Sequence, residues 1–210
     1  MISAEKIFKK YKKPVLSGVS LNISKGEVVG IGGENGSGKS TLLSVLGGFI
    51  KADSGEVKIS GTVGYVPQET ALFDNLSVKD NLRFWASAYN VPYDGVSIGE
   101  MIGDDYINKK VRHLSGGMKK RLSIALASLH NPDCLIMDEP TAALDIGFKR
   151  IMAQLIEDMR ANGKAVIFTS HQPDELLWCD RVYILRGGKF VYAGEPEEMG
   201  SLSEVLYGSV

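Results

Sequence analysis

The sequence is poor in the features that mark several classes of protein. It has only two cysteines, Cys134 and Cys179, whose spacing and neighbours indicate neither a metal site nor a disulfide framework. The 24 basic and 25 acidic residues leave a formal net charge of −1, which argues against a nucleic-acid binder driven by charge. No apolar run reaches the roughly 18 residues that span a bilayer, and the N-terminus lacks a signal-peptide apolar region. We therefore expect a protein that does not span a membrane by itself, although it can dock on one that does.

What the sequence does contain is the composition of an ordinary globular protein. Of its 210 residues, 44% are hydrophobic and 23% are charged, which suffices for one large domain or two small lobes. Cys134 lies in the apolar run CLIMDE, where a buried thiol acts as a small hydrophobe, and this favours a reducing compartment. The basic run KIFKKYKK, residues 6–13, is interpreted as a solvated edge.

Apolar runs typical of buried strands alternate along the chain with helical patterns. The predicted strands are 27–33, two short strands around Gly61 within 56–68, 133–139, 164–171, and a hairpin over 181–194 that turns at Gly187-Gly188. The predicted helices are 39–49, 77–90 with Ser77 as its N-cap, a strongly amphipathic helix over 116–130, and 146–160. This order predicts an α/β fold with a largely parallel sheet, into which the more polar, helical stretch of about 70–132 is inserted as a second lobe.

Polar clusters follow three of the predicted strands. They are the glycine loop after 27–33, Asp138-Glu139 after the next apolar strand, and His171 at the end of 164–170. Ligands of parallel sheets bind at the carboxyl ends of the strands, so the chain order predicts that these clusters meet at one edge.

The glycine loop has the composition of a triphosphate site. Its core reads G-x-x-x-x-G-K-S, and glycines allow successive N–H groups to point inward as an anion nest at the start of a helix. Lys39 can reach the β- and γ-phosphates, and the Ser40 hydroxyl can ligate Mg²⁺. A flexible linker is the alternative, but a strand before the loop and a helix after it argue against that. The predicted nucleotide-binding residues of the loop are Gly33, Glu34, Asn35, Gly36, Ser37, Gly38, Lys39, Ser40 and Thr41.

The two acids after the strand 133–137 fit the same chemistry. Asp138 is assigned to Mg²⁺ and Glu139 to the general base that deprotonates the attacking water. Strands often end in acidic residues, so this pair alone is weak evidence for a site. Together with the glycine loop upstream, it is strong evidence. A histidine at a strand end is more often structural, but His171 ends the following strand and is predicted to reach the γ-phosphate.

The stretch LSGGMKKR, residues 114–121, carries a resemblance to a known family. The chain resembles the nucleotide-binding subunits of ABC transporters over essentially its whole length, with the motifs in the family's order. Gly33–Ser40 resembles the Walker A motif, Gln68 the Q-loop glutamine, Leu114–Met118 the signature motif, Cys134–Asp138 the Walker B motif, Glu139 the catalytic glutamate, AALD ending at Asp145 the D-loop, and His171 the H-loop histidine.

The resemblance implies a fold and a site. The fold is a P-loop NTPase core of the RecA-like type, with a mostly parallel sheet, a small antiparallel β region and an inserted α-helical subdomain. It implies ATP and Mg²⁺ as ligands, with Gln68 as a further magnesium ligand and Tyr11 stacked on adenine. For Tyr11, a solvated surface position is the alternative. The single ABC ATPase domain then covers 1–210, with 1–69 and 133–210 as the core lobe and 70–132 as the helical lobe.

The signature motif adds a second anion site, because Ser115, Gly116 and Gly117 stand at the start of the helix 116–130. A helix N-cap with glycines for close packing is the alternative. The resemblance implies a head-to-tail dimer in which one subunit's signature and Asp145 close on the ATP of the other. Its partners are a second ATP-binding subunit, in a homo- or heterodimer, and a transmembrane permease subunit at the cytoplasmic face of the cell membrane, where the chain is peripheral. No nucleic acid is expected.

The helical lobe is expected to present a groove to the permease. Phe73, Phe84, Trp85 and Tyr89 either line this groove or form the core of the lobe. Met118 replaces a glutamine common in importers, and LSGGMKKR is similar to exporter-like ATPases. One alternative function is a soluble, non-transport ABC ATPase, but such proteins usually have tandem cassettes or a coiled coil. A second is a GTPase or a small-molecule kinase. The sequence shows neither the NKxD motif of a GTPase nor the acceptor pocket of a kinase.

Overall fold

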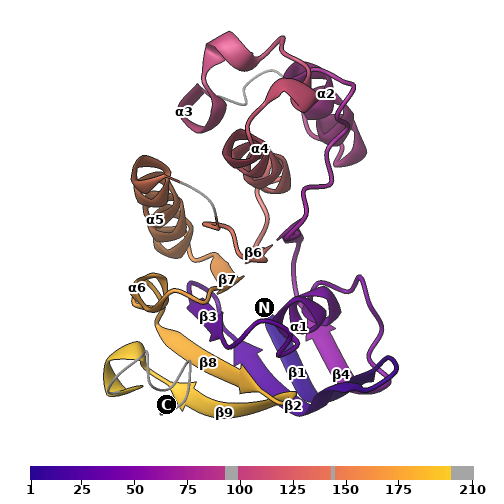
Figure 1. Ribbon diagram of the computed structural model, residues 1–210, viewed down its shortest axis with the longest axis vertical. Coiled ribbons are helices and arrows are strands. Elements are labelled where there is room, and N and C mark those ends of the chain that lie inside the picture. The colour runs from indigo at the N-terminus through magenta and orange to yellow at the C-terminus, as the bar shows by residue number, and fades with distance from the viewer. Residues whose placement is uncertain (93–98, 143–144, 200–210) are drawn as a thin grey trace.

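The computed structural model describes residues 1–92, 99–142 and 145–199, and these form two sheets with helices around them (Figure 1). A three-stranded antiparallel sheet has the order β2-β1-β4, and a six-stranded sheet has the order β5-β6-β7-β3-β8-β9. The strands are β1 Ile2–Lys10, β2 Pro14–Ile23, β3 Val28–Gly32, β4 Ser54–Ile59, β5 Val63–Val66, β6 Cys134–Met137, β7 Ala165–Thr169, β8 Arg181–Arg186 and β9 Lys189–Gly194. The helices are α1 Lys39–Leu46, α2 Val78–Ala88, α3 Gly99–Ile102, α4 Gly116–Ser128, α5 Ile146–Ala161 and α6 Pro173–Leu176, with 3₁₀ turns η1 Asp104–Tyr106, η2 Val111–His113 and η3 Pro196–Met199.

The six-stranded sheet is parallel from β5 to β8, and only β9 runs antiparallel. Every residue of β3, β6 and β7 is buried, as expected of strands covered on both faces. Successive residues therefore enter different cores. Ile136 packs with α1 and the antiparallel sheet, whereas its neighbours Leu135 and Met137 pack with α5. The predicted fold class is confirmed.

A third hydrophobic cluster lies in the helical segment drawn at the top of Figure 1. It joins Val78 and Leu82 of α2 to Val111 of η2 and to Leu122 and Leu126 of α4. The predicted N-cap of α2 is present, because the Ser77 hydroxyl accepts a hydrogen bond from the amide of Asp80. Among the residues that the structure describes, no helix has both the length and the apolar character needed to cross a membrane.

The prediction of a strongly amphipathic helix over 116–130 was wrong. The helix α4 ends at Ser128, and its residues Leu122–Ala127 are all buried in succession. The reason is its position, since Leu122 packs into the helical cluster while Ile124 packs into the cluster beneath α5. A helix that contacts two cores has no solvated stripe over that stretch.

The strands β1 and β2 were not predicted from the sequence. The interpretation of residues 6–13 as a solvated edge is correct for only some of their lysines. Ile7 is fully buried in the core and the Lys9 side chain is only 14% exposed, whereas Lys6 and Lys10 are exposed. The register of β1 shifts between Ala4 and Ile7, and Lys6 has a φ of 48°. This bulge breaks the period-two alternation of a strand and hides it from pattern analysis.

Candidate nucleotide-binding site

The glycine loop connects β3 to α1, as predicted, and glycine is required at both of its ends. At Gly33 the φ is +143°, and an added Cβ would lie 2.3 Å from the carbonyl oxygen of Leu185. At Gly38 the φ is +108°, and a Cβ would lie 3.0 Å from the carbonyl oxygen of Val15. The loop thus passes close to the backbone of the neighbouring strands, at the edge where parallel sheets bind ligands.

The Lys39 side chain is buried inside this loop. Its ammonium donates hydrogen bonds to the carbonyl oxygens of Gly33 at 2.7 Å and Glu34 at 3.0 Å. Burial lowers the pKa of Lys39, while the nearby carboxylates of Glu139 and Asp138 oppose that shift. The loop therefore surrounds the Lys39 ammonium, which lies near the carboxylates of Glu139 and Asp138.

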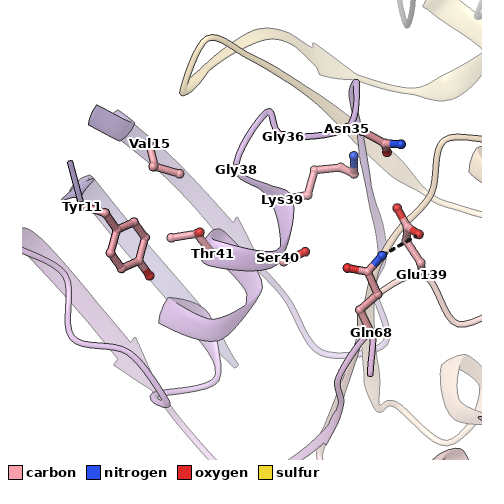
Figure 2. Close-up of a pocket in the computed structure, with 10 residues that line it drawn as sticks. All are labelled: Tyr11, Val15, Asn35, Gly36, Gly38, Lys39, Ser40, Thr41, Gln68 and Glu139. Atoms are coloured by element: carbon pink, nitrogen blue, oxygen red, sulfur yellow. Dashed lines mark hydrogen bonds between the residues drawn. The ribbon is translucent and has the colours of Figure 1, made fainter. Parts of the chain in front are cut away.

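A cleft of about 420 Å³ lies beside the loop (Figure 2). It is lined by Tyr11, Val15, Asn35, Gly36, Gly38, Lys39, Ser40, Thr41, Gln68 and Glu139. In Figure 2, Tyr11 lies at one end, and Gln68 and Glu139 lie at the other with the loop between them. Tyr11 is 56% exposed, with the Lys9 ammonium 5.7 Å from the centroid of its ring, so the ring remains accessible to a planar ligand. The structure thus brings Tyr11, the loop, Gln68 and Glu139 to one site.

Glu139 is held in an unusual backbone conformation. Its φ is 46°, in the left-handed region that costs a non-glycine residue about 1–3 kcal/mol. Its amide donates to the Thr169 hydroxyl at 2.8 Å, and its carboxylate accepts a hydrogen bond from the Gln68 amide nitrogen at 3.3 Å (Figure 2). These contacts direct the Glu139 side chain into the cleft.

Thr169 is a residue of the site that the sequence reading missed. It is fully buried, and its hydroxyl donates to Asp138 at 2.7 Å while it accepts the amide of Glu139. The signal lies in the strand register. Because Met137 pairs with Phe168 in adjacent parallel strands, the next residues, Asp138 and Thr169, also lie side by side. The sequence alone does not say which strands are adjacent.

His171 reaches the same edge, with its Nδ1 at 3.8 Å from a Glu139 oxygen. The segment before it is fixed by a buried carboxylate, Glu175, which accepts hydrogen bonds from the hydroxyls of Ser170 and Thr141, both at 2.6 Å. Lys149 lies 2.8 Å from the other Glu175 oxygen. This network connects the segment that carries His171 to the chain that follows Glu139.

The signature residues line a different cleft, of about 570 Å³. Its lining includes Ser115, Gly116, Gly117, Arg121 and Asp145. The Ser115 hydroxyl caps α4 by accepting from the amide of Met118 at 3.2 Å. Within the described part of the chain, this cleft and the nucleotide cleft share no lining residue. Gly116 also lines a third cleft together with Gln68 and Glu139, but none of these three clefts joins a signature residue to the glycine loop of the same chain.

Asp145 begins α5 and connects it to α4. Its carboxylate accepts the amide of Phe148 at 2.9 Å and pairs with Arg121 at 2.7 Å. The hydrogen bond from Phe148, followed by the charge of Arg121, lowers the pKa of Asp145. Ala143 and Leu144, the middle of the predicted D-loop, lie outside the described residues.

Fold and site together define a P-loop nucleotide-binding cassette. A protein-family model described as ABC transporter matches residues 16–142, which is more than half of the chain. The chain belongs to the ABC transporter family, as an ATP-binding cassette with ATPase activity. This confirms the predicted family and class of enzyme.

Relatives and solved structures agree with this assignment. The linearmycin resistance ATP-binding protein LnrL of Bacillus subtilis is 34% identical, over 96% of this chain and 71% of that protein. The Nod factor export ATP-binding protein I of Rhizobium etli is 32% identical, over 89% of this chain and 65% of that protein. The dimeric post-hydrolysis state of the ATP-binding cassette MJ0796, bound to ADP and Pi, superposes with a TM-score of 0.87 at 28% identity, covering 93% of this chain and 99% of that chain.

Proposed function

We propose that the chain binds ATP with Mg²⁺ in the nucleotide cleft, closes on it together with a second cassette, and hydrolyses it to drive export through a permease. The observation that carries the proposal is the joint placement of Tyr11, the buried Lys39, Gln68 and Glu139 around one cleft. Tyr11 would stack on the adenine. The amides of the loop and the Lys39 ammonium would take the phosphates, which replace the two carbonyls that now accept its hydrogen bonds.

The oxygen donors at the cleft fit Mg²⁺. Ser40 and Gln68 line the cleft, and Asp138 lies at the strand end beneath it with one oxygen held by Thr169. Hydroxyl, amide and carboxylate oxygens are ligands that this hard cation accepts, and it retains waters as well. These three residues would hold the ion, which would neutralise charge on the β- and γ-phosphates when bound.

Hydrolysis assigns one role to each polar side chain at the far end of the cleft. A water oxygen attacks the γ-phosphorus, its proton passes to the Glu139 carboxylate, and the bond to the β-phosphate oxygen breaks to release ADP and phosphate. Gln68 orients Glu139 through the hydrogen bond at 3.3 Å. His171, 3.8 Å from Glu139, would contact the γ-phosphate from the other side.

A second cassette supplies the residues that this cleft lacks. Ser115, Gly116, Gly117 and Asp145 line a cleft that contains no residue of the glycine loop, which supports their contact with ATP on another chain. The helix α4 is capped by Ser115 there, and its free amides favour an anion. The similar cassette MJ0796 has been solved as a dimer, which supports the pairing of two cassettes.

The permease would dock on the helical lobe, within 70–132. Phe73 and Phe84 are 41% and 48% exposed and stack edge-on at 4.6 Å, and the row of rings continues through Trp85 to Tyr89. Trp85 and Tyr89 are partly buried, so the exposed aromatic surface is the pair Phe73 and Phe84, and such a surface is typical of an interaction site. We place the chain at the cytoplasmic face of the membrane through this contact. Export rather than import is favoured by the names of relatives that confer linearmycin resistance or export Nod factor.

The test is a pull-down from detergent-solubilised membranes of the source cells, with ATP and Mg²⁺. The bait is the Glu139→Gln variant, whose turnover is expected to fall by about 10²–10⁴-fold through loss of the base while ATP-bound dimers persist. The matched control is Lys39→Ala, which removes the phosphate-binding cation. A polytopic membrane protein enriched over the control would support transport. A soluble assembly enriched instead would favour a non-transport ABC ATPase, and wild-type turnover in Glu139→Gln would remove that residue from its role.

A further inference from the structure

A second buried lysine, Lys120, lies behind the nucleotide cleft. It belongs to α4, the helix that begins with the signature motif, and it is only 7% exposed. Its ammonium donates to the carbonyl oxygens of Pro67 at 3.0 Å, Gln68 at 2.9 Å and Asp138 at 3.4 Å. A lysine ammonium has three N–H donors, and the geometry uses each of them.

The three carbonyls belong to segments that have just left the sheet. The strand β5 ends at Val66 and β6 at Met137, two residues that pair in register. The three carbonyls follow the last paired residues of β5 and β6, and a buried carbonyl without a partner costs free energy. Lys120 therefore connects three structures at one point: the signature helix, the segment of Gln68 and the segment of Asp138 and Glu139.

Two opposing effects act on the Lys120 ammonium. Burial disfavours an ammonium and lowers the pKa of Lys120, while the carboxylates of Asp138 and Glu139 oppose this. The preceding residue, Lys119, offers the contrast, because it lies nearer the surface and pairs with the exposed Asp74 at 2.7 Å. The consecutive residues Lys119 and Lys120 therefore make different contacts, the first with an exposed carboxylate and the second with backbone carbonyls.

We propose that Lys120 is a positioning residue for ATP hydrolysis, which anchors the backbone of Gln68 to the signature helix so that the Gln68 amide stays on Glu139. This rests on the proposed function, since it assigns to Lys120 the support of the Gln68–Glu139 pair. Lys120 lines a neighbouring cleft with Gln68 and Glu139 but does not line the cleft of the glycine loop, so it acts through Gln68 rather than on the phosphates held by that loop. The anchor also means that a displacement of α4 pulls directly on the residue beside the general base.

The experiment compares Lys120→Met, which keeps the length of the side chain and removes its donors, with Lys119→Met as the matched control. Steady-state ATP hydrolysis by the full chain should show kcat lowered by about tenfold or more in Lys120→Met, as misplacement near the chemistry does, with KM within about twofold. Lys120→Gln should recover part of kcat, because an amide restores two donors. A fall in Lys119→Met as large as that in Lys120→Met would overturn the proposal.

A double-mutant cycle tests the route through Gln68. In a Gln68→Ala background, Lys120→Met should lower kcat no further, since the side chain that it positions is gone. A second, equal loss in that background would contradict the proposal. If Lys120→Met does not yield folded protein, the same cycle is run with Lys120→Gln, which must then lose kcat relative to Lys119→Gln.

A readout without nucleotide separates this proposal from the proposed function. Hydrogen exchange of the peptide 67–72 should quicken in Lys120→Met and stay unchanged in Lys119→Met, because Lys120 holds the carbonyls of Pro67 and Gln68, whereas Lys119 pairs with Asp74 outside that peptide. If the wild-type chain failed to hydrolyse ATP, the proposed function would fall while the exchange result still decided the anchor. Unchanged exchange in Lys120→Met would overturn the anchor even in an active enzyme.

Discussion

At the scale of single residues, one buried hydroxyl supports both acids of the site. Thr169 donates to Asp138 and accepts from the amide of Glu139, whose backbone is left-handed. The same side chain therefore orients the proposed magnesium ligand and offsets the strain beneath the proposed general base. A valine in its place would fill the same volume with no polar atom.

We expect Thr169→Val to destabilise the fold and to slow hydrolysis. The free energy of unfolding should fall by about 1–3 kcal/mol, because the buried Asp138 oxygen and the Glu139 amide lose their partner. Turnover should fall by about tenfold, since both acids are then free to move. Urea unfolding and steady-state ATPase assays measure the two effects, with Thr169→Ser as the control that retains the hydroxyl. Wild-type turnover in Thr169→Val would show that its hydrogen bonds do not position the acids.

At the scale of elements, α2 combines a buried side with an exposed aromatic one. Val78 and Leu82 lie in the helical cluster, while Phe84 on the same helix is half exposed and contacts the ring of Phe73. The two alternatives raised for these aromatics thus divide among them. Trp85 packs against the cluster, whereas Phe73 and Phe84 remain available to a partner.

Phe84→Ser should abolish the capture of a permease without changing the ATPase activity of the isolated cassette. The reason is that Phe84 lies on the surface of the helical lobe, away from the residues that line the nucleotide cleft. The matched control is Leu177→Ser, an equally exposed apolar residue beside α6 in the core lobe. The pull-down described above measures both. Equal permease recovery with Phe84→Ser and wild type would place the docking surface elsewhere.

Elements and motifs differ in how far the sequence predicts them. The parallel strands and the loop from Gly33 to Ser40 follow from apolar runs and a dense local motif, so both were found. The strand β1 was missed because a bulge at Lys6 breaks its alternation, and its hairpin partner β2 was missed with it. Thr169 and Lys120 could not be assigned, since their roles depend on which strand and which helix lie beside them, and such long-range pairings leave no local pattern.

At the scale of the whole molecule, the two clefts lie on different parts of the fold. The nucleotide cleft is lined by residues of β2 and α1 and of the segments that follow β1, β3, β5 and β6, and the signature cleft is lined by α3, η1, the start of α4 and Asp145, which caps α5. Between them runs α4, with the signature at its start and Lys120 one turn further on. In the proposed dimer, one chain therefore carries two half-sites for ATP rather than one complete site.

This division has a consequence for mixtures of defective chains. Lys39→Ala should disable the nucleotide cleft, and Gly116→Asp should disable the signature cleft, where the glycine has open space for a side chain whose charge repels phosphate. Each variant alone should be inactive. In an equal mixture, half of the dimers pair one of each, and one of their two sites is intact, so about a quarter of wild-type activity should return. Reassembly from separately purified chains measures this complementation, and a mixture as inactive as its components would contradict a site shared between chains. Two mutations that each abolish function would then complement one another when they lie on different chains of the same dimer.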